Sequence, residues 1–301
     1  MTRTRRRDRA DEGGEGFLGA AVGTGGDVVV IGVPFEQGSV QSAGCAQAPS
    51  TLRALTRGES ISAGIWDYAS RRRIIQGLSL SDAGDFEYRA SIPRGTYFRT
   101  LEDFTSTLAS EGRIPLGFGG DHSVTLPLAR GVAKAHGRIQ VVQLDAHHDY
   151  APVARGRLPT HSNFVSFLAR SPGIHRVVQL GVRGYSSWLP RRPRGVIDVP
   201  LADAADAIEP GLETYLTIDT DAFDPTLAPA VVHPMPGGLT WADLDQVLTL
   251  LARRRCAIVG LDWTEYNPTL EGRNFPTGIA IVHALIRVLG ALDRARREGR
   301  R

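Results

Sequence analysis

Residues 139–149 have the sequence IQVVQLDAHHD, in which a short apolar run leads directly into two aspartates and two histidines. The run at residues 139–144 is short and rich in β-branched residues, which is typical of a buried parallel strand. Asp145, His147 and Asp149 share parity, so an extended chain would point them to one side. Such a group could ligate a metal ion, although a polar loop after a strand is the alternative interpretation.

A second segment with the same design is GFGGDHS at residues 117–123. It follows a predicted strand at residues 114–118 and precedes a predicted helix at residues 124–135, for which Ser123 is placed as the cap. At the start of a helix the dipole disfavours protonation, which would keep the imidazole of His122 neutral and able to bind a metal. A loop with a hydrogen-bonded histidine is the alternative for this segment taken alone.

The third segment is TIDTDAFDP at residues 217–225, after a predicted strand at residues 215–218. Asp219 and Asp221 share parity, and two carboxylates so close repel each other unless a cation lies between them. Asp224 precedes a proline and is interpreted as a turn residue.

Together the three segments predict a metal centre. The carboxyl ends of parallel strands meet at one edge of a sheet, so these side chains can converge. Two histidines and four aspartates are too many hard ligands for one ion, but they suit two divalent cations that share carboxylates and a water, as in hydrolytic sites. The predicted ligands are His122, Asp145, His147, Asp149, Asp219 and Asp221. His148 has the opposite parity and is predicted either to be structural or to support the ligands without binding the metal itself.

Strands that alternate with helices predict an α/β fold with a mostly parallel sheet covered on both faces. Further apolar runs are at residues 28–33, 177–181 and 257–261. Thr240 and Asp243 form a capping-box pattern at the start of another helix, and the closing helix is expected near Gly278.

The chain has 301 residues, enough for one large domain. Residues 1–26 are rich in arginine, glycine and acidic residues and lack an apolar period, so we expect a flexible arm there. No repeat or linker divides the remainder, and residues 27–301 are predicted to form a single catalytic domain.

The formal charge of +3 comes from arginines at the two ends of the chain. Residues 10–293 carry 25 basic against 30 acidic residues, a net charge of −5. Because no basic face with aromatic residues is recognisable, nucleic-acid binding is not expected. The cysteines, Cys45 and Cys256, are widely spaced and predicted to be free thiols. No uninterrupted apolar signal region follows the first arginines, and no stretch approaches the length of a membrane span, so a cytoplasmic location without membrane association is expected.

The three motifs, in this order, resemble the ureohydrolase family, which includes arginase, agmatinase and guanidinobutyrase. They are Gly119-Gly120-Asp121-His122-Ser123, Asp145-Ala146-His147-x-Asp149 and Asp219-x-Asp221-x-x-Asp224-Pro225. Residues 32–35 with Gly38, and residues 48–49, are similar to the agmatinase and guanidinobutyrase branch, and residues 236–240 and 265–268 also match. The resemblance covers nearly the whole chain after the arm.

This resemblance implies a three-layer α/β/α sandwich with a mostly parallel sheet of about eight strands, two Mn²⁺ ions per chain, and homotrimers or homohexamers. By position, one ion would be held by His122, Asp145, Asp149 and Asp219, and the other by Asp145, His147, Asp219 and Asp221. Glu265 matches the family residue that receives the guanidinium, and His161 matches its proton shuttle. A histidine that merely begins a helix is the alternative for His161.

The sequence departs from the family pattern around the expected substrate pocket. His233 stands where a small hydroxyl residue is usual, and Ser162-Asn163 stands where glycine is common after the histidine. Arg155 and Arg157 could bind a substrate carboxylate, or they could lie in a solvated loop. These differences leave the substrate open.

The predicted function is therefore hydrolysis of a small guanidino compound, of the agmatine or guanidino-acid type, to urea and an amine by a metal-bridging hydroxide. An arginase-like enzyme acting on N-hydroxyarginine, arginine or peptidyl arginine in a biosynthetic pathway is the alternative. A single-zinc deacetylase-like enzyme or a non-catalytic metal-binding relative is more remote. The deacetylase pattern needs only an Asp, His, Asp set, so His122 and Asp149 argue against it.

Overall fold

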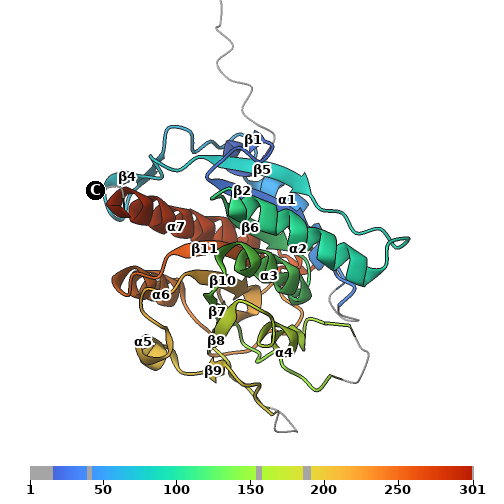
Figure 1. The fold of residues 1–301 in the computed structure, drawn as a ribbon. Helices are drawn as coiled ribbons and strands as arrows, with labels where there is room; N and C mark the ends of the chain where they lie inside the picture. The colour runs from blue at the N-terminus through green and yellow to red at the C-terminus, as the bar shows by residue number, and fades with distance from the viewer. Residues whose placement is uncertain (1–15, 39–42, 154–157, 186–190, 300–301) are drawn as a thin grey trace, which may run out of the picture.

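The fold is built on one parallel sheet. The computed structural model describes residues 16–38, 43–153, 158–185 and 191–299. In this part of the chain nine strands form a sheet in the order β1-β5-β2-β6-β11-β10-β7-β8-β9, and every neighbouring pair is parallel (Figure 1). The strands are β1 (Ala21–Val22), β2 (Val28–Val33), β5 (Leu80–Asp85), β6 (Ile114–Gly119), β7 (Ile139–Leu144), β8 (Ile174–Leu180), β9 (Val196–Asp198), β10 (Thr214–Asp219) and β11 (Ile258–Thr264); β3 (Ile65–Asp67) and β4 (Arg72–Ile74) form a separate antiparallel pair.

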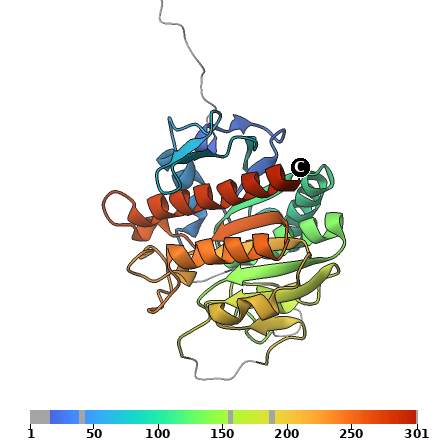
Figure 2. The ribbon, with the colours of Figure 1, turned by 90° about the vertical axis from the view of Figure 1, so that its left-hand side faces the viewer.

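Helices cover both faces of the sheet and complete three layers. One face carries α1 (Ala48–Leu55), α5 (Ala204–Ala207), α6 (Trp241–Arg253) and α7 (Pro276–Gly299), and the other carries α2 (Arg94–Ser110), α3 (Thr125–His136) and α4 (Phe164–Leu168). Figure 2 shows α6 and α7 side by side across one face. Short 3-10 helices connect these elements: η1 (Phe17–Gly19), η2 (Cys45–Gln47), η3 (His122–Val124), η4 (Leu201–Asp203), η5 (Thr220–Ala222) and η6 (Pro268–Leu270).

The apolar runs of the sequence exist because each central strand is buried on both faces. In β2, Val28 and Val30 pack into the core beneath α1 and α7, whereas Val29, Ile31 and Val33 pack into the core beneath α2 and α3. Side chains of alternating parity therefore serve two hydrophobic cores, and the sheet between them is held rigidly.

The predicted three-layer α/β architecture is confirmed, with nine strands where about eight were expected. The edge strands β1 and β9 have only two and three residues, too short to give an apolar run. The capping box at the start of α6 is also confirmed: Thr240 Oγ1 accepts from the Asp243 N–H at 3.3 Å, and Asp243 Oδ2 accepts from the Thr240 N–H at 2.7 Å.

The predicted arm at residues 1–26 needs correction, because part of residues 16–26 is packed against the sheet. Phe17 and Leu18 are buried, and the Phe17 ring lies 4.8 Å from the Phe118 ring, edge to face. The Phe17 N–H donates to Asp82 Oδ2 at 3.0 Å, and β1 pairs with β5. The folded part thus begins before Val28. Residues 1–15 lie outside the described residues.

The last helix also differs from expectation. By length and composition α7 could cross a membrane, although no stretch was expected to approach that length. However, 61% of its most apolar window is buried inside the molecule, where Ile281, Leu285 and Val288 belong to the hydrophobic core. Its apolar face is accounted for by packing on the sheet.

Replacing Phe17 tests whether this segment contributes to the fold. Phe17→Ala should lower the free energy of unfolding by about 3–5 kcal/mol, because a fully buried ring is removed. Val22→Ala, five residues on and 78% exposed, is the control and should change it by less than about 0.5 kcal/mol. Urea denaturation followed by circular dichroism measures both. Equal effects would show that residues 16–26 do not pack as described.

Candidate metal centre and active site

Four neighbouring strands position the candidate site. In the middle of the sheet β6, β11, β10 and β7 lie side by side, and each ends at the same edge. In that order they lead to His122, to Glu265, to the aspartates at 219 and 221, and to the 145–149 segment. Ligands bind at the carboxyl ends of strands in open α/β sheets, so the fold brings these distant residues into one site.

The first cluster surrounds the imidazole of His122. Its Nδ1 lies 3.1 Å from Asp145 Oδ2, 3.2 Å from Asp149 Oδ2 and 3.1 Å from Asp219 Oδ2. All four side chains are buried. Nδ1 has no hydrogen-bond partner within the described chain, so three carboxylate oxygens surround a buried nitrogen that is free to bind a cation.

A hydrogen-bond chain fixes the orientation of this imidazole. Nε2 of His122 lies 2.9 Å from Thr217 Oγ1, and that hydroxyl donates to Asp262 Oδ1 at 2.6 Å. Because the Thr217 hydroxyl donates its hydrogen bond to Asp262, the Thr217 oxygen accepts a hydrogen bond from the N–H at Nε2 of His122. Nδ1 is then left unprotonated in the neutral ring, which is the tautomer that a metal site requires.

The second cluster is formed by Asp145, His147 and Asp221. Nδ1 of His147 lies 3.0 Å from Asp221 Oδ2 and 3.7 Å from Asp145 Oδ1. Asp145 therefore offers one oxygen to each cluster, and Gln143 Nε2 donates to its Oδ2 at 2.5 Å. Each cluster has ligand atoms close enough together to hold one cation, with Asp145 shared between them.

The pKa shifts of these groups reflect burial and the repulsion between carboxylates, both of which a bound cation would offset. Burial, together with the charges of Asp221 and Asp145, raises the pKa of Asp219 well above its ordinary value. Burial and Asp145 raise the pKa of Asp149 to about 7. Burial lowers the pKa of His147, but the hydrogen bond and charge of Asp221 outweigh it and raise the pKa to about 10.

The expectation that the helix start keeps His122 neutral is wrong for this site without a cation. Burial lowers its pKa, but the carboxylates of Asp145, Asp149 and Asp219 raise it well above the ordinary value. Three adjacent carboxylates outweigh the dipole of a three-residue 3-10 helix. In the absence of divalent cations the site therefore takes up protons, and the donor set of carboxylates and imidazoles fits two hard or borderline cations.

Glu265 lies beside the clusters in a constrained conformation, with φ +58° directly after β11. Its Oε1 accepts from the His122 N–H at 2.8 Å, and its own N–H donates to the Gly120 carbonyl at 2.9 Å. Burial and the nearby Asp121 carboxylate raise the pKa of Glu265 to about 8. A cationic group bound here would restore its negative charge.

Asp121 supports the site through hydrogen bonds to the backbone of neighbouring segments. It caps η3, and its Oδ2 also accepts from the Gly38 N–H at 2.6 Å. Ser123, predicted to cap the helix at residues 124–135, lies inside η3 instead, and α3 begins at Thr125 without a side-chain cap. The Gly38 carbonyl oxygen lies 2.9 Å from His161 Nδ1 and accepts a hydrogen bond from its N–H. The GGDHS segment thus positions His161 as well as His122.

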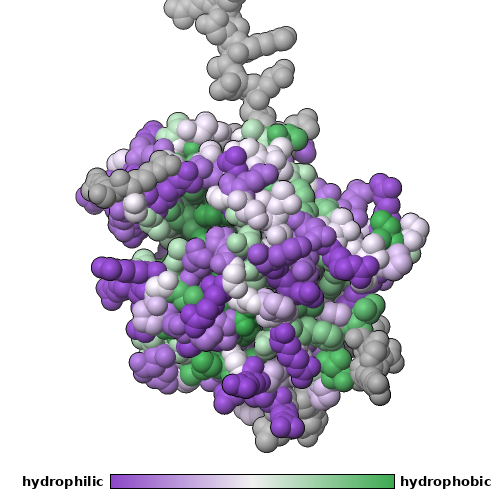
Figure 3. All heavy atoms as spheres, in the orientation of Figure 1, coloured by the Kyte–Doolittle hydropathy of each residue, from purple (hydrophilic) through white to green (hydrophobic). Residues whose placement is uncertain are grey.

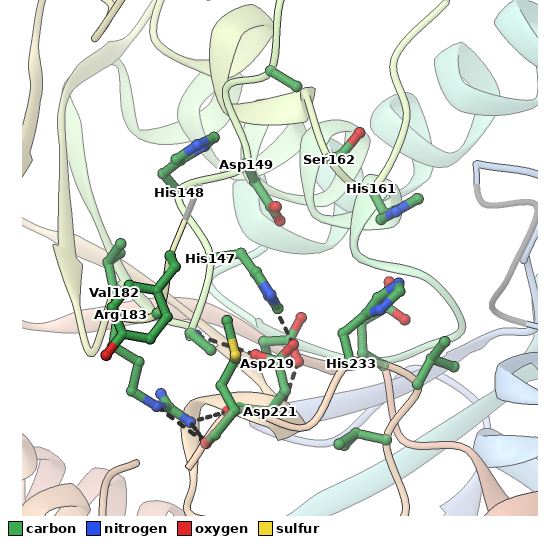
Figure 4. Close-up of a pocket in the computed structure, with 18 residues that line it drawn as sticks. His147, His148, Asp149, His161, Ser162, Val182, Arg183, Asp219, Asp221 and His233 are labelled. Atoms are coloured by element: carbon green, nitrogen blue, oxygen red, sulfur yellow. Dashed lines mark hydrogen bonds and ion pairs between the residues drawn. The ribbon is translucent and has the colours of Figure 1, made fainter. Parts of the chain in front are cut away.

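A cavity of 570 Å³ opens onto these residues (Figure 4). In the described part of the chain it is lined by Ala146, His147, His148, Asp149, Ala151, His161, Ser162, Val182, Arg183, Gly184, Tyr185, Asp219, Asp221, Val231, Val232, His233, Met235 and Glu265. Figure 4 shows the ring of His147 directed toward Asp219 and Asp221. His233 lines the wall with its ring 6.1 Å from that of His147, and burial followed by the charges of His147 and His161 lowers its pKa.

The other predicted site residues lie differently. Asn163 is absent from the described lining; its Oδ1 accepts from the Thr160 N–H at 2.8 Å and so shapes the turn that carries His161. Arg155 and Arg157 lie outside the described residues. His148 reaches the cavity wall, but its Nδ1 accepts from the Tyr150 N–H at 3.2 Å and its ring stacks on Tyr150, which fits the predicted structural role.

Arg183 is a site residue to which the sequence analysis gave no role. Its guanidinium contacts six carbonyl oxygens, which belong to residues 181, 221–223, 235 and 236; the shortest are Met235 at 2.6 Å and Asp221 at 2.8 Å. Its backbone N–H donates to the Ala146 carbonyl at 3.0 Å. Arg183 thus joins three segments of the centre, and because its donors are occupied it is poorly placed to bind a substrate carboxylate.

A parallel sheet with aspartates and histidines clustered at its carboxyl edge is the architecture of a metal-assisted α/β enzyme. Comparison with known proteins specifies the family. The family model described as Arginase family matches residues 26–290. The chain is 31% identical to an agmatinase from Sodalis glossinidius over 277 residues, which covers 87% of this chain and 86% of that protein. It is 28% identical to a formimidoylglutamase from Halalkalibacterium halodurans, with 86% and 85% covered.

Solved structures agree with this result. A hypothetical agmatinase from Burkholderia thailandensis superposes with a TM-score of 0.80 at 25% identity, covering 95% of this chain and 92% of that chain. Proclavaminate amidino hydrolase from Streptomyces clavuligerus gives a TM-score of 0.77 at 26% identity, covering 90% and 93%. The chain belongs to the Arginase family and is a hydrolase of carbon–nitrogen bonds.

Metal binding should release protons. At pH 7 a cation displaces at least one proton per chain, because the pKa of His147 is about 10 and that of Asp149 about 7 without a cation. Affinity for Mn²⁺ should therefore rise with pH between about pH 6 and 8. Titration calorimetry in buffers of different ionisation enthalpy measures the release. A heat independent of the buffer, with a flat pH dependence of affinity, would contradict this description.

Arg183→Ala should lower the affinity for Mn²⁺ or the kcat by about 10–100-fold, because the substitution removes the hydrogen bond that holds the backbone carbonyl of Asp221. At saturating Mn²⁺ the KM for substrate should stay close to the wild-type value, because the guanidinium is used on carbonyls. Metal titration and steady-state kinetics separate the two effects. A raised KM with unchanged metal affinity would show instead that Arg183 contacts the substrate.

Proposed function

We propose that this protein is a dinuclear manganese amidinohydrolase that converts a small guanidino compound, of the agmatine or guanidino-acid type, to urea and an amine. The observation that carries the proposal is the sharing of Asp145 between two clusters, one around His122 and one around His147. A site for one ion would not need both. The proximity of His122 to three carboxylates also argues against the single-zinc and non-catalytic alternatives.

In this proposal the first ion is held by His122, Asp145, Asp149 and Asp219, and the second by Asp145, His147, Asp219 and Asp221. Divalent cations bound between these side chains would lower the pKa of a bound water toward neutrality and so supply the nucleophile. Gln143 and Thr217 hold Asp145 and His122 in position, so the ligands need little reorganisation.

Glu265 receives the guanidinium of the substrate. A guanidinium stays protonated near neutrality and pairs with a carboxylate through two parallel hydrogen bonds. The bond from the His122 N–H fixes Oε1 of Glu265, and burial strengthens the attraction between its carboxylate and an incoming cation. Glu265 thereby places the substrate carbon beside the metal ligands.

His161 provides the proton for the leaving amine. Its Nδ1–H donates to the Gly38 carbonyl, which holds the ring at the cavity wall and leaves Nε2 to take up and release a proton. His233 lies across the cavity at the position where the family pattern is broken, and we propose that it contributes to substrate choice. Roles for Arg155, Arg157 and Asn163 in substrate binding stay predictions.

One observation favours a second candidate, the arginase-like alternative acting on N-hydroxyarginine, arginine or peptidyl arginine. The cavity of 570 Å³ falls in the size range that accommodates ligands larger than a short guanidino chain. The similar structure named proclavaminate amidino hydrolase indicates that this fold also serves other amidino substrates. We further propose that the chain from residue 16 onward forms one catalytic domain in a cytoplasmic homotrimer or homohexamer.

Urea release by Mn²⁺-loaded protein tests the proposal. The urea assay should include agmatine, 4-guanidinobutyrate, arginine and an arginyl peptide. Hydrolysis of N-hydroxyarginine is measured by release of hydroxyurea, and that of formimidoylglutamate, the substrate that one relative's name suggests, by release of formamide, because neither compound can yield urea. At least one guanidino compound should yield urea with kcat/KM lowered about 100-fold or more by Glu265→Gln.

Three variants separate the assigned roles. Asp145→Ala should lose both metals and activity, whereas Glu265→Gln should keep two metals per chain and lose activity. Asp245→Asn, a carboxylate on the exposed side of α6, is the control and should retain both. Full activity in Asp145→Ala, or absence of urea from every guanidino substrate, would overturn the proposal.

A further inference from the structure

A second cavity, of 840 Å³, lies next to the segment that follows Asp149. Residues 150–153 form one wall, and the other walls come from the end of α4, the start of β8 and the approach to β9. Its lining includes four arginines, Arg170, Arg191, Arg192 and Arg194, and no acidic residue among those that the structure describes. No role in the proposed hydrolysis uses this cavity.

The four arginine side chains form no direct ion pair with acidic neighbours in the described part of the chain. Within the described chain none of them forms a side-chain hydrogen bond or an ion pair, and all four are exposed. In Figure 3 hydrophilic side chains, interspersed with apolar ones, lie on the surface over β8, β9 and α4. By contrast, Arg138 and Arg176 on the same side of the sheet both pair with Glu209, at 3.1 and 2.6 Å.

The acidic residues near this cavity either already form ion pairs or lie outside its lining. Glu209 also contacts His175, the histidine in the cavity wall, at 2.8 Å, so one carboxylate serves three side chains, Arg138, Arg176 and His175. Asp198 interacts electrostatically with Arg192, and it lies outside the lining. The charge facing the cavity is therefore positive overall, and four like charges around one concave surface repel one another unless an anion is present.

We propose that this cavity is a binding site for a small, multiply charged anion, such as a compound with a phosphate, sulfate or several carboxylates. Guanidinium groups bind such oxyanions through paired hydrogen bonds. The volume lies within the range of small-molecule sites, and the surface is concave. A nucleic-acid surface would instead present a basic stripe with stacking aromatics, whereas Tyr150 is the one aromatic residue in the described lining.

The position of the site places it next to the catalytic cavity. Ala151 lines both cavities, and its N–H donates to the carbonyl of Ser162 at 2.9 Å, beside His161. The metal ligands themselves are absent from the second lining. Anion binding there can thus be measured separately from metal loading and turnover, and the inference stands or falls independently of the proposed reaction.

Sulfate is a suitable probe because it carries two charges and binds Mn²⁺ weakly. Titration calorimetry of the Mn²⁺-loaded protein at constant ionic strength, with chloride as the balancing ion, should show saturable binding at one site per chain. The double variant Arg191→Gln/Arg194→Gln should weaken this binding at least about tenfold while keeping the wild-type metal content. Inorganic phosphate should compete with sulfate.

The matched control is Arg57→Gln/Arg253→Gln, which removes two exposed arginines elsewhere and leaves the same net charge. It should bind sulfate like the wild type. Absence of saturable binding by the wild type, or an equal loss in both double variants, would overturn the proposal. The proposal would also be overturned if the wild type bound no sulfate and light scattering showed a loss of oligomer mass in Arg191→Gln/Arg194→Gln but not in the control. The arginines would then face a second copy of the chain.

Discussion

The crowding of buried carboxylates at the carboxyl ends of β7 and β10 is the constraint on which the site depends. Asp145 and Asp219 each lie 3.1 Å from His122, and Asp219 and Asp221 are two residues apart. Burial and mutual repulsion make such a group costly to charge, which is why the pKa of Asp219 is raised well above its ordinary value. Two divalent cations would remove this cost, so the fold carries a cluster whose charged form requires them.

The sheet and a shell of hydrogen-bonding side chains hold that cluster together. Thr217 and Asp262 fix His122 from below, and Gln179 donates to Gln143, which in turn donates to Asp145. Arg183 ties the loops above to one another through their carbonyls. None of these supporting contacts needs the substrate. The metal ligands are thus held in place by rigid strands, and the variable part of the site is the wall that contains His233.

Much of this arrangement is predictable from the sequence, because the central strands are apolar runs and the ligands directly follow them. The parity argument, however, does not explain the convergence of Asp145 and Asp149: the chain leaves the strand after Leu144 and Asp149 has φ +47°. A turn brings the carboxylates together. Contacts between distant segments were beyond the sequence, including the carbonyl clamp of Arg183 and the packing of Phe17. Both depend on tertiary neighbours that no local pattern records.

The number and position of bound cations test the central claim most directly. Anomalous diffraction from crystals grown with Mn²⁺ should show two peaks per chain, about 3.5–4 Å apart, one beside Nδ1 of His122 and one beside Nδ1 of His147. Asp145 should contact both peaks. A single peak, or two peaks that do not share Asp145, would contradict the account.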